Sequence, residues 1–139
     1  MTGADDLPAD VRALLHDHIE SYEQLETLLL LRREPHGQWS GCAVAERLRV
    51  RQELIETGLA GLEASGLVQP DGGAPPRFAY RPANSRLGAA VDRLEHEYAQ
   101  RPILIIQLMS ANAIERLRTA ALHTFADAFV LKKKEKDRG

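Results

Sequence analysis

Residues 45–68 read AERLRVRQELIETGLAGLEASGLV, and this stretch decides the fold. The spacing of apolar residues predicts a short helix over residues 41–48 and a longer helix over residues 51–65. A tight turn at Arg49 and Val50 separates the two helices. Two helices joined by so short a turn are typical of a helix-turn-helix. The buried stripe of the second helix consists of Ile55, Leu59 and Leu62.

A β-hairpin is expected directly after the second helix. Gly66 supplies the left-handed C-cap that ends this helix, and Leu67 supplies the apolar contact that usually follows it. The segments LVQ (67–69) and RFAYR (77–81) have the composition of short strands. The loop between them, PDGGAPP, is rich in proline and glycine, so a helix cannot cross it.

Helical spacing flanks this motif on both sides. Residues 8–19 and 22–31 predict two helices before it, and a long helix begins after it at Asn84 or Ser85. Pro102 breaks or kinks that helix, and a further helical stretch continues to about residue 131. The expected fold class is therefore mainly α with a small β-hairpin.

The length and charge of the chain suggest one domain and a tail. With 139 residues, of which 44% are hydrophobic, the chain can bury one ordinary core. We expect a single domain over residues 1–131, made of a core over 8–83 and C-terminal helices over 84–131, and then a basic disordered tail over 132–139. The tail has five basic and two acidic residues, hence +3 against a net charge of −2 for the chain. Such a run is either a solubilising tail or a phosphate-binding arm.

Several features favour a cytoplasmic protein without a membrane segment. Cys42 is the single cysteine, which excludes an intramolecular disulfide. The N-terminus, MTGADDLPAD, is acidic and lacks the apolar core of a signal peptide. The longest apolar runs, at residues 28–31 and 103–106, are far shorter than the roughly 20 residues of a membrane-spanning helix.

The order of helices and strands, with the motif residues, resembles the winged helix-turn-helix superfamily of bacterial regulators, which includes MarR-like, ArsR-like and PadR-like repressors. The resemblance covers residues 39–82, about a third of the chain, and makes the hairpin the wing. The ending FADAFVLKKK is also similar to that of a group of bacterial winged-helix proteins of unassigned function. The matching residues of the motif are Val44, Ala45, Leu48, Val50, Ile55, Leu59, Leu62, Gly66, Leu67 and Val68.

The resemblance implies that the helix over residues 51–65 lies in the major groove of DNA. Gln52 and Thr57 are its conventional base readers, since glutamine suits adenine and threonine suits a base or a phosphate. Three glutamates on the same helix, Glu53, Glu56 and Glu63, oppose tight binding because DNA is a polyanion. The outward positions of this helix are Gln52, Glu53, Glu56, Thr57, Ala60 and Glu63.

Arginines at the turn and on the wing offset these carboxylates. Over residues 40–83, five arginines balance five acidic residues. One alternative is that these arginines lie on solvated edges of helices and strands and pair with neighbouring acids. The other is that they contact phosphates, and such contacts hold a protein on DNA without reading its sequence. We predict that the DNA-binding residues are Arg49, Arg51, Gln52, Thr57, Arg77 and Arg81.

The predicted function is that of a small bacterial transcriptional regulator that binds double-stranded DNA with weak base readout. The alternative is a protein-interaction module that uses the acidic helix over residues 51–65 or the C-terminal helices. The helix that begins at Asn84 or Ser85 and the apolar stripe at Phe125, Ala128 and Phe129 either fold back on the domain or form a homodimer. The hypothesis of a dimer is the one we favour.

We expect that the protein is not an enzyme and that it has no catalytic residue, no metal site and no cofactor. His16 and His18 are two residues apart, about 200° around a helix, so they cannot close on one ion. No glycine-rich phosphate loop or nucleophile motif is present in the sequence. Cys42 falls in the first turn of the helix over residues 41–48, where it is either a small packed residue or a thiol that senses oxidants.

Overall fold

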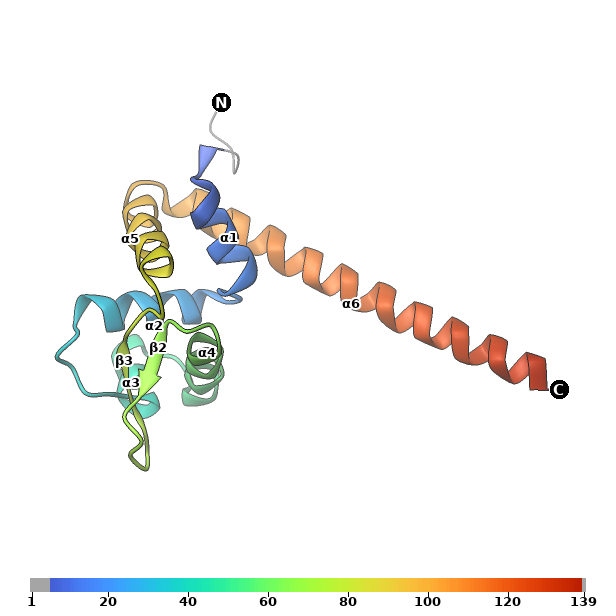
Figure 1. Cartoon of the computed structure of the whole chain (residues 1–139), viewed down its shortest axis with the longest axis horizontal. Helices are drawn as coiled ribbons and strands as arrows, with labels where there is room; N and C mark the ends of the chain where they lie inside the picture. The colour runs from blue at the N-terminus through green and yellow to red at the C-terminus, as the bar shows by residue number, and fades with distance from the viewer. Residues whose placement is uncertain (1–5, 139) are drawn as a thin grey trace. The chain divides into compact units, whose positions relative to one another are not determined.

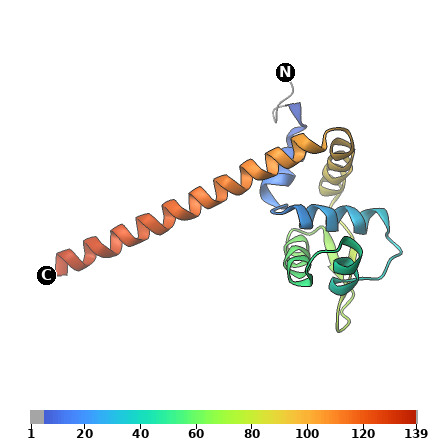
Figure 2. The same cartoon turned by 180° about the vertical axis from the view of Figure 1, so that it is seen from behind.

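The structure is a computed structural model that describes residues 6–138, with side chains up to residue 130 (Figures 1 and 2). The chain divides into two compact units, residues 1–109 and residues 110–139. The last helix, α6 (Pro102–Arg138), contributes residues to both units.

The first unit follows the order of elements that the sequence predicts. Its helices are α1 (Ala9–Asp17), α2 (Tyr22–Arg33), α3 (Gly41–Leu48), α4 (Gln52–Ala64) and α5 (Ser85–Gln100), and its strands are β1 (Trp39–Ser40), β2 (Val68–Pro70) and β3 (Arg77–Tyr80). Pro102 opens α6, where its missing N–H removes no intrahelical bond. The predicted break at this proline is therefore confirmed.

Helix α2 forms the centre of the core of this unit. It lies between α5 on one side and α3, α4 and the sheet on the other (Figure 1). Four of its leucines, at positions 25, 28, 29 and 31, are fully buried, as expected of a helix that is apolar nearly all round. The predicted stripe of α4 is also buried, with Ile55, Leu59 and Leu62 at most 1% exposed.

A buried amide connects α2 with α4. The side chain of Gln24 donates from Nε2 to the carbonyl of Gly58 at 3.0 Å, and its Oε1 accepts the N–H of Glu20 at 2.7 Å. A Cβ atom at Gly61 would lie 2.6 Å from that same Nε2. Two glycines on α4 therefore give the amide of Gln24 the room it needs to reach the helix backbone.

The ends of α3 and α4 carry the predicted caps. The hydroxyl of Ser40 accepts the N–H of Ala43 at 3.1 Å. At the end of α4, Gly66 has a φ of 76°; its N–H donates to the carbonyl of Glu63 at 3.0 Å, and the N–H of Leu67 donates to the carbonyl of Leu62 at 2.9 Å. These bonds form a Schellman motif, which ends α4 and directs the chain into β2.

The sheet has three antiparallel strands in the order β1-β3-β2. Val68 pairs with Tyr80 in the hairpin, and Trp39 pairs with Phe78 on the other side of β3. The hairpin is predicted from the sequence, but β1 is not. A strand of two residues is too short to show alternation, so only its position against β3 identifies it.

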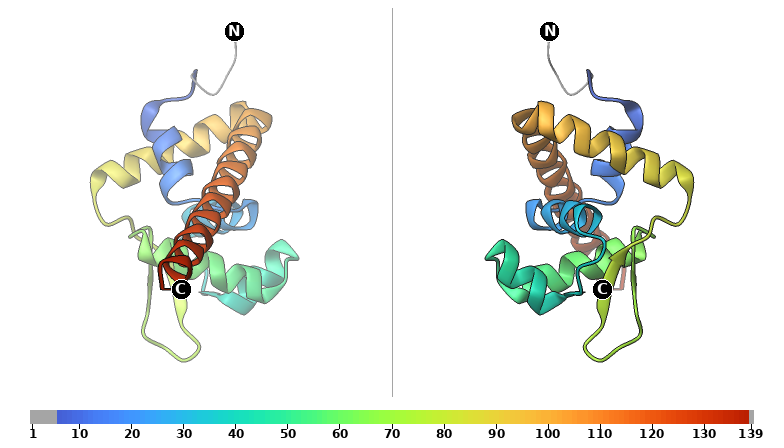
Figure 3. Two further views of the ribbon diagram at one scale, coloured as in Figure 1. Left: turned by 90° about the vertical axis from the view of Figure 1, so that its right-hand side faces the viewer. Right: turned by 90° about the vertical axis from the view of Figure 1, so that its left-hand side faces the viewer.

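The loop over residues 71–76 extends beyond the ends of α3 and α4 (Figures 1 and 3). At its base the carboxylate of Asp71 accepts the N–H of Gly73 at 2.9 Å and the N–H of Arg77 at 3.0 Å. Residues 68–81, which are the hairpin and the residue that follows β3, are called the wing from here on.

The second unit consists of helix α6 from residue 110 onward. Its ring pair, Phe125 and Phe129, has centroids 6.5 Å apart. The tail predicted over residues 132–139 belongs to α6 up to Arg138, and residue 139 lies outside the described residues. The predicted domain limits, 1–131 with 8–83 and 84–131, stay a prediction. Over the described residues, no helix is both long and apolar enough to span a membrane.

Candidate nucleic-acid interface

The turn between α3 and α4 places an arginine in the left-handed region. Arg49 has a φ of 57° and a ψ of 47°, and its N–H donates to the carbonyl of Ala45. This conformation costs a residue with a side chain about 1 kcal/mol, so glycine would be more stable here. No other non-glycine residue of the described range has a positive φ. An arginine kept in such a conformation is a candidate for a functional role.

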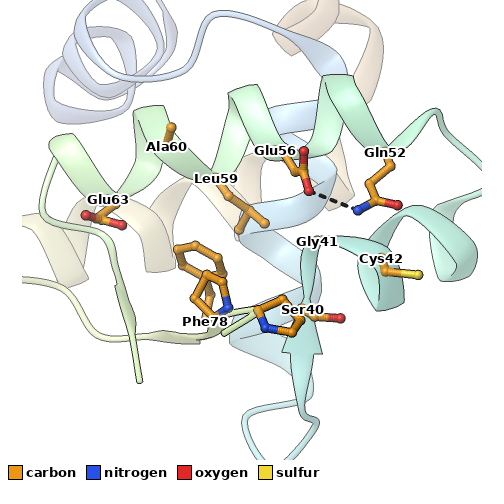
Figure 4. A pocket seen from close by; sticks show the side chains of 11 residues that line it. Ser40, Gly41, Cys42, Gln52, Glu56, Leu59, Ala60, Glu63 and Phe78 are labelled. Carbon is orange, nitrogen blue, oxygen red and sulfur yellow. Dashed lines mark hydrogen bonds between the residues drawn. The ribbon is translucent and has the colours of Figure 1, made fainter. Parts of the chain in front are cut away.

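Helix α4 has two differently composed exposed surfaces. At about 100° per residue, the positions farthest from the buried stripe are Glu53, Thr57, Ala60 and Ala64. The flank toward the wing carries Gln52, Glu56 and Glu63, which line a pocket of about 270 Å³ (Figure 4). The six outward positions predicted from the sequence therefore divide between a face that points straight out and a flank that faces the wing.

Both predicted base readers are hydrogen bonded within the helix. Gln52 donates from Nε2 to the carboxylate of Glu56 at 2.9 Å (Figure 4). Thr57 donates its hydroxyl proton to the carbonyl of Glu53 at 3.0 Å. Thr57 is on the outermost face and keeps its oxygen as an acceptor, whereas Gln52 uses one of its two amide N–H donors on Glu56 and keeps the other donor and its carbonyl oxygen.

Three of the four predicted phosphate-binding arginines have exposed side chains without an acidic partner. Arg49 lies in the turn, Arg51 is the N-cap residue of α4, and Arg81 follows β3. Within the described part of the chain, no carboxylate comes within 4 Å of their guanidinium groups. The expectation that neighbouring acids pair with these arginines therefore does not hold for these three.

Several arginines on other surfaces of the first unit have acidic partners. Arg47 of α3 lies 3.3 Å from a carboxylate oxygen of Glu34. At the end of α2, Arg32 pairs with Asp92 at 2.7 Å and also with Glu95, and Arg33 pairs with Glu95 at 2.6 Å. Two further pairs are Arg93 with Asp10 and Arg101 with Glu97.

The wing carries its two arginines on the same side of β3. Side chains alternate along a strand, so Arg77 and Arg81 share a face and stand about 13 Å apart. Both border a hollow of about 250 Å³, together with Gln38 and Gln69. Arg77 therefore lies next to the wing loop, and Arg81 lies at the opposite end of the strand.

Asp71 holds the wing turn together and is not among the site residues predicted from the sequence. Its two backbone hydrogen bonds, from Arg77 and from Gly73, hold the pKa of its carboxyl below the usual 3.8, and the charge of Arg77 adds to this effect. An aspartate followed by two glycines is a common start of such a turn, so the signal is present in the sequence DGG.

Cys42 is exposed in the first turn of α3 and lines the same pocket as Gln52 and Glu56. It is therefore not packed inside the motif, which was one of the two alternatives for this residue. The helix begins with the cap of Ser40, so the thiol lies next to the positive end of a short helix.

The fold is similar to that of solved MarR-family structures. The MarR family transcription regulator SP03579 aligns with a TM-score of 0.51 and 16% identity, over 86% of this chain and 81% of that chain. MepR, described as a transcription regulator of the Staphylococcus aureus multidrug efflux pump MepA, gives 0.49 and 14%, over 86% and 90%. A mutant of S. aureus MepR bound to an oligodeoxyribonucleotide gives 0.48 and 13%, over 78% and 79%.

The match with SP03579 confirms the predicted fold class, a mainly helical winged-helix fold with a small antiparallel sheet. SP03579 and MepR are each described as a transcription regulator. No protein-family model and no curated sequence matches the chain. The resemblance to the group with the FADAF ending, and the choice between MarR-like, ArsR-like and PadR-like subfamilies, stay predictions at the level of sequence.

Proposed function

We propose that this chain is a small winged-helix transcriptional regulator that binds double-stranded DNA. Helix α4 enters the major groove, and the arginines of the turn and wing contact phosphates on either side. The predicted contacts are Arg49, Arg51, Gln52, Thr57, Arg77 and Arg81.

The observation that carries this proposal is the exposed and unpaired state of Arg49, Arg51 and Arg81 within the described residues. A free guanidinium group can bind a phosphate through two parallel hydrogen bonds. Each phosphate neutralised in this way releases condensed counterions, and that release supplies much of the affinity of a protein for DNA. Such contacts do not need a helix with a strong base-reading face.

Base reading is the weaker part of the interface. Thr57 points straight out, but its neighbours on the outermost face are Glu53 and two alanines. A glutamate can accept a hydrogen bond from the amino group of cytosine, so Glu53 is compatible with one base pair and repels phosphate elsewhere. We therefore expect binding that depends strongly on salt and only modestly on sequence.

The test is fluorescence anisotropy of the purified chain with random-sequence duplex DNA at about 50 and 200 mM salt. We expect binding at the lower salt that weakens by orders of magnitude at the higher one. The Glu53→Lys variant should bind more tightly, because it places a cation on the face of α4 that meets DNA. Glu115→Lys makes the same change in net charge on α6 and should have little effect.

Absence of binding at the lower salt would overturn the DNA proposal. Equal gains from Glu53→Lys and Glu115→Lys would mean that net charge, and not α4, controls the affinity. The protein-interaction alternative would then be the next hypothesis to test.

The proposal includes a homodimer through α6. Within the second unit, Ile114, Leu117, Phe125 and Phe129 are between 57% and 71% exposed. They recur at helical spacing, so they share one face, and an apolar face of this kind is typical of an interaction surface. A dimer would present two motifs to successive half-sites on DNA, which compensates for a weak single contact.

Light scattering at micromolar concentration tests the dimer. We expect the mass of two chains for the unchanged protein and the mass of one chain for Phe125→Lys. Thr119→Lys, on the other side of the same helix, is the matched control and should remain dimeric. A monomeric mass for the unchanged chain removes this part of the proposal.

A further inference from the structure

The pocket between α4 and the wing has the lining of a site for an organic cation. It has a volume of about 270 Å³, which suits a ligand smaller than a typical drug. Its walls include two glutamates and no lysine or arginine. Figure 4 shows Glu56 and Glu63 toward its two ends, with Leu59 between them and Phe78 beside it.

The two carboxylates are spaced for a ligand with two charges. Glu56 and Glu63 are seven residues apart, which places them on the same side of α4 and about 10 Å apart along its axis. Neither has an ion-pair partner within the described residues. Glu56 accepts one hydrogen bond, from Gln52, and its charge is otherwise uncompensated by a side chain.

The floor between the carboxylates is apolar. Leu59 is 1% exposed and lies midway between the two glutamates in the sequence. Phe78, Ala60 and the prolines of the wing loop complete this surface. A ligand that places both ends on carboxylates must therefore cross apolar side chains, and an alkyl chain does so with a gain in free energy.

Glu56 is held in place by the backbone of α3. A Cβ atom at Gly41 would lie 2.9 Å from Cγ of Glu56, so the stem of this glutamate rests on the first residue of the helix. A side chain that is already positioned loses less conformational entropy when a ligand binds. Glycine at position 41 thus keeps one wall of the pocket preformed.

We propose that this pocket binds a linear organic dication, an α,ω-diamine whose ammonium groups meet Glu56 and Glu63 while its alkyl chain lies over Leu59 and Phe78. An ammonium group on Glu56 also competes with Gln52 for that carboxylate. Binding therefore frees this N–H of Gln52 and neutralises two charges next to α4. If the proposed DNA binding holds, on which this last step rests, the diamine raises the affinity for DNA, and DNA raises the affinity for the diamine.

The site is tested without DNA, by titrating ¹⁵N-labelled protein with heptane-1,7-diamine at constant ionic strength. Its extended chain separates its two nitrogens by about the spacing of the carboxylates. We expect amide shifts confined to α4, the first turn of α3 and the wing. Propane-1,3-diamine and heptylamine should bind about fivefold more weakly, because each can satisfy only one carboxylate at a time.

Variants separate the pocket from general attraction to an acidic surface. Glu63→Gln should lower the affinity for heptane-1,7-diamine about fivefold. Glu53→Gln removes an equal charge outside the pocket and should leave this affinity unchanged. Gly41→Ala should also lower the affinity for the diamine. Circular dichroism shows whether this variant is folded. Equal affinity for the long and the short diamine, or equal loss in Glu63→Gln and Glu53→Gln, would overturn the site.

The link to DNA is a separate measurement. Anisotropy with duplex DNA is measured with and without heptane-1,7-diamine, at a diamine concentration near the dissociation constant of the unchanged protein. The unchanged protein should bind DNA more tightly with the diamine, and Glu63→Gln should show a smaller gain. Failure to bind DNA in either condition contradicts the proposed function but leaves the titration result intact. Unchanged DNA affinity with the diamine bound would overturn the coupling alone.

Discussion

The arginines at the end of α2 and those at the turn before α4 differ in what surrounds them. Arg32 and Arg33 face Asp92 and Glu95 of α5 at hydrogen-bonding distance. Arg49 is three residues from Glu46 and Arg51 is two residues from Glu53, yet no carboxylate comes within 4 Å of either guanidinium group in the described structure. The first pair joins two helices of the scaffold, and the second pair remains available to a partner.

This difference shows why local charge balance is a poor guide to function. Over residues 40–83 the charges cancel, which suggests a neutral surface. In three dimensions the carboxylates of α4 lie on the helix, while the cations lie at its N-terminal end and on the wing. A neutral count therefore conceals a surface in which the two signs are separated.

The largest expected effect comes from removing the cations of the turn. The double variant Arg49→Ala, Arg51→Ala should lose about tenfold in DNA affinity for each arginine, the usual cost of a hydrogen bond to a charged group. The slope of log affinity against log salt should fall by about two. Anisotropy at several salt concentrations measures both. An unchanged slope would show that neither side chain contacts phosphate.

The matched double variant on the scaffold is Arg32→Ala, Arg33→Ala. Its DNA affinity should stay unchanged, and its free energy of unfolding should fall by about 1 kcal/mol, because the ion pairs are partly open to water and Glu95 loses both partners. Urea unfolding followed by circular dichroism gives the stability. A loss of DNA affinity as large as in the turn variant would erase the contrast between the two regions.

A substitution at the turn should move stability and DNA affinity in opposite directions. Arg49→Gly relieves the cost of the left-handed conformation and should stabilise the protein by about 1 kcal/mol, while DNA affinity falls. Arg49→Ala keeps that conformational cost, so it should lose DNA affinity without gaining stability. Thermal unfolding and anisotropy on the same samples provide the comparison. Equal stability of the two variants would contradict the assigned strain.

The smallest effect concerns the turn of the wing and depends on pH. The hydrogen bonds from Arg77 and Gly73 lower the pKa of Asp71 in the folded chain below 3.8. These two hydrogen bonds therefore stabilise the turn fully above pH 3.8. The stabilisation is lost as the pH falls through the lowered pKa that Asp71 has in the folded chain. Amide shifts of Gly73 and Arg77 should follow this titration and be absent in Asp71→Asn. A midpoint above 3.8 would rule out this role.

Much of the fold could be predicted, because its signals are local. Ser40, Gly66 and Pro102 each impose a helix boundary by their own backbone chemistry, and all three boundaries are where the sequence places them. Strand β1 has no such signal, since Trp39 and Ser40 become a strand only through pairing with β3.

The residue types of the candidate site could be predicted from the sequence, but the neighbouring side chains of each residue could not. All six predicted DNA-binding residues are exposed, yet whether an arginine has an acidic neighbour depends on which helices pack together. The sequence also does not show that Gln52, Glu56 and Glu63 face the wing, because the position of the hairpin beside α4 is a property of the tertiary structure.

The hydrogen bond from Gln24 to Gly58 has a mechanical consequence. Because the donor belongs to α2 and the acceptor is the backbone of α4, the two helices cannot slide past each other without breaking this buried hydrogen bond. The position of helix α4 is therefore fixed relative to α2. Its angle toward a bound molecule can change only when α2 moves with it.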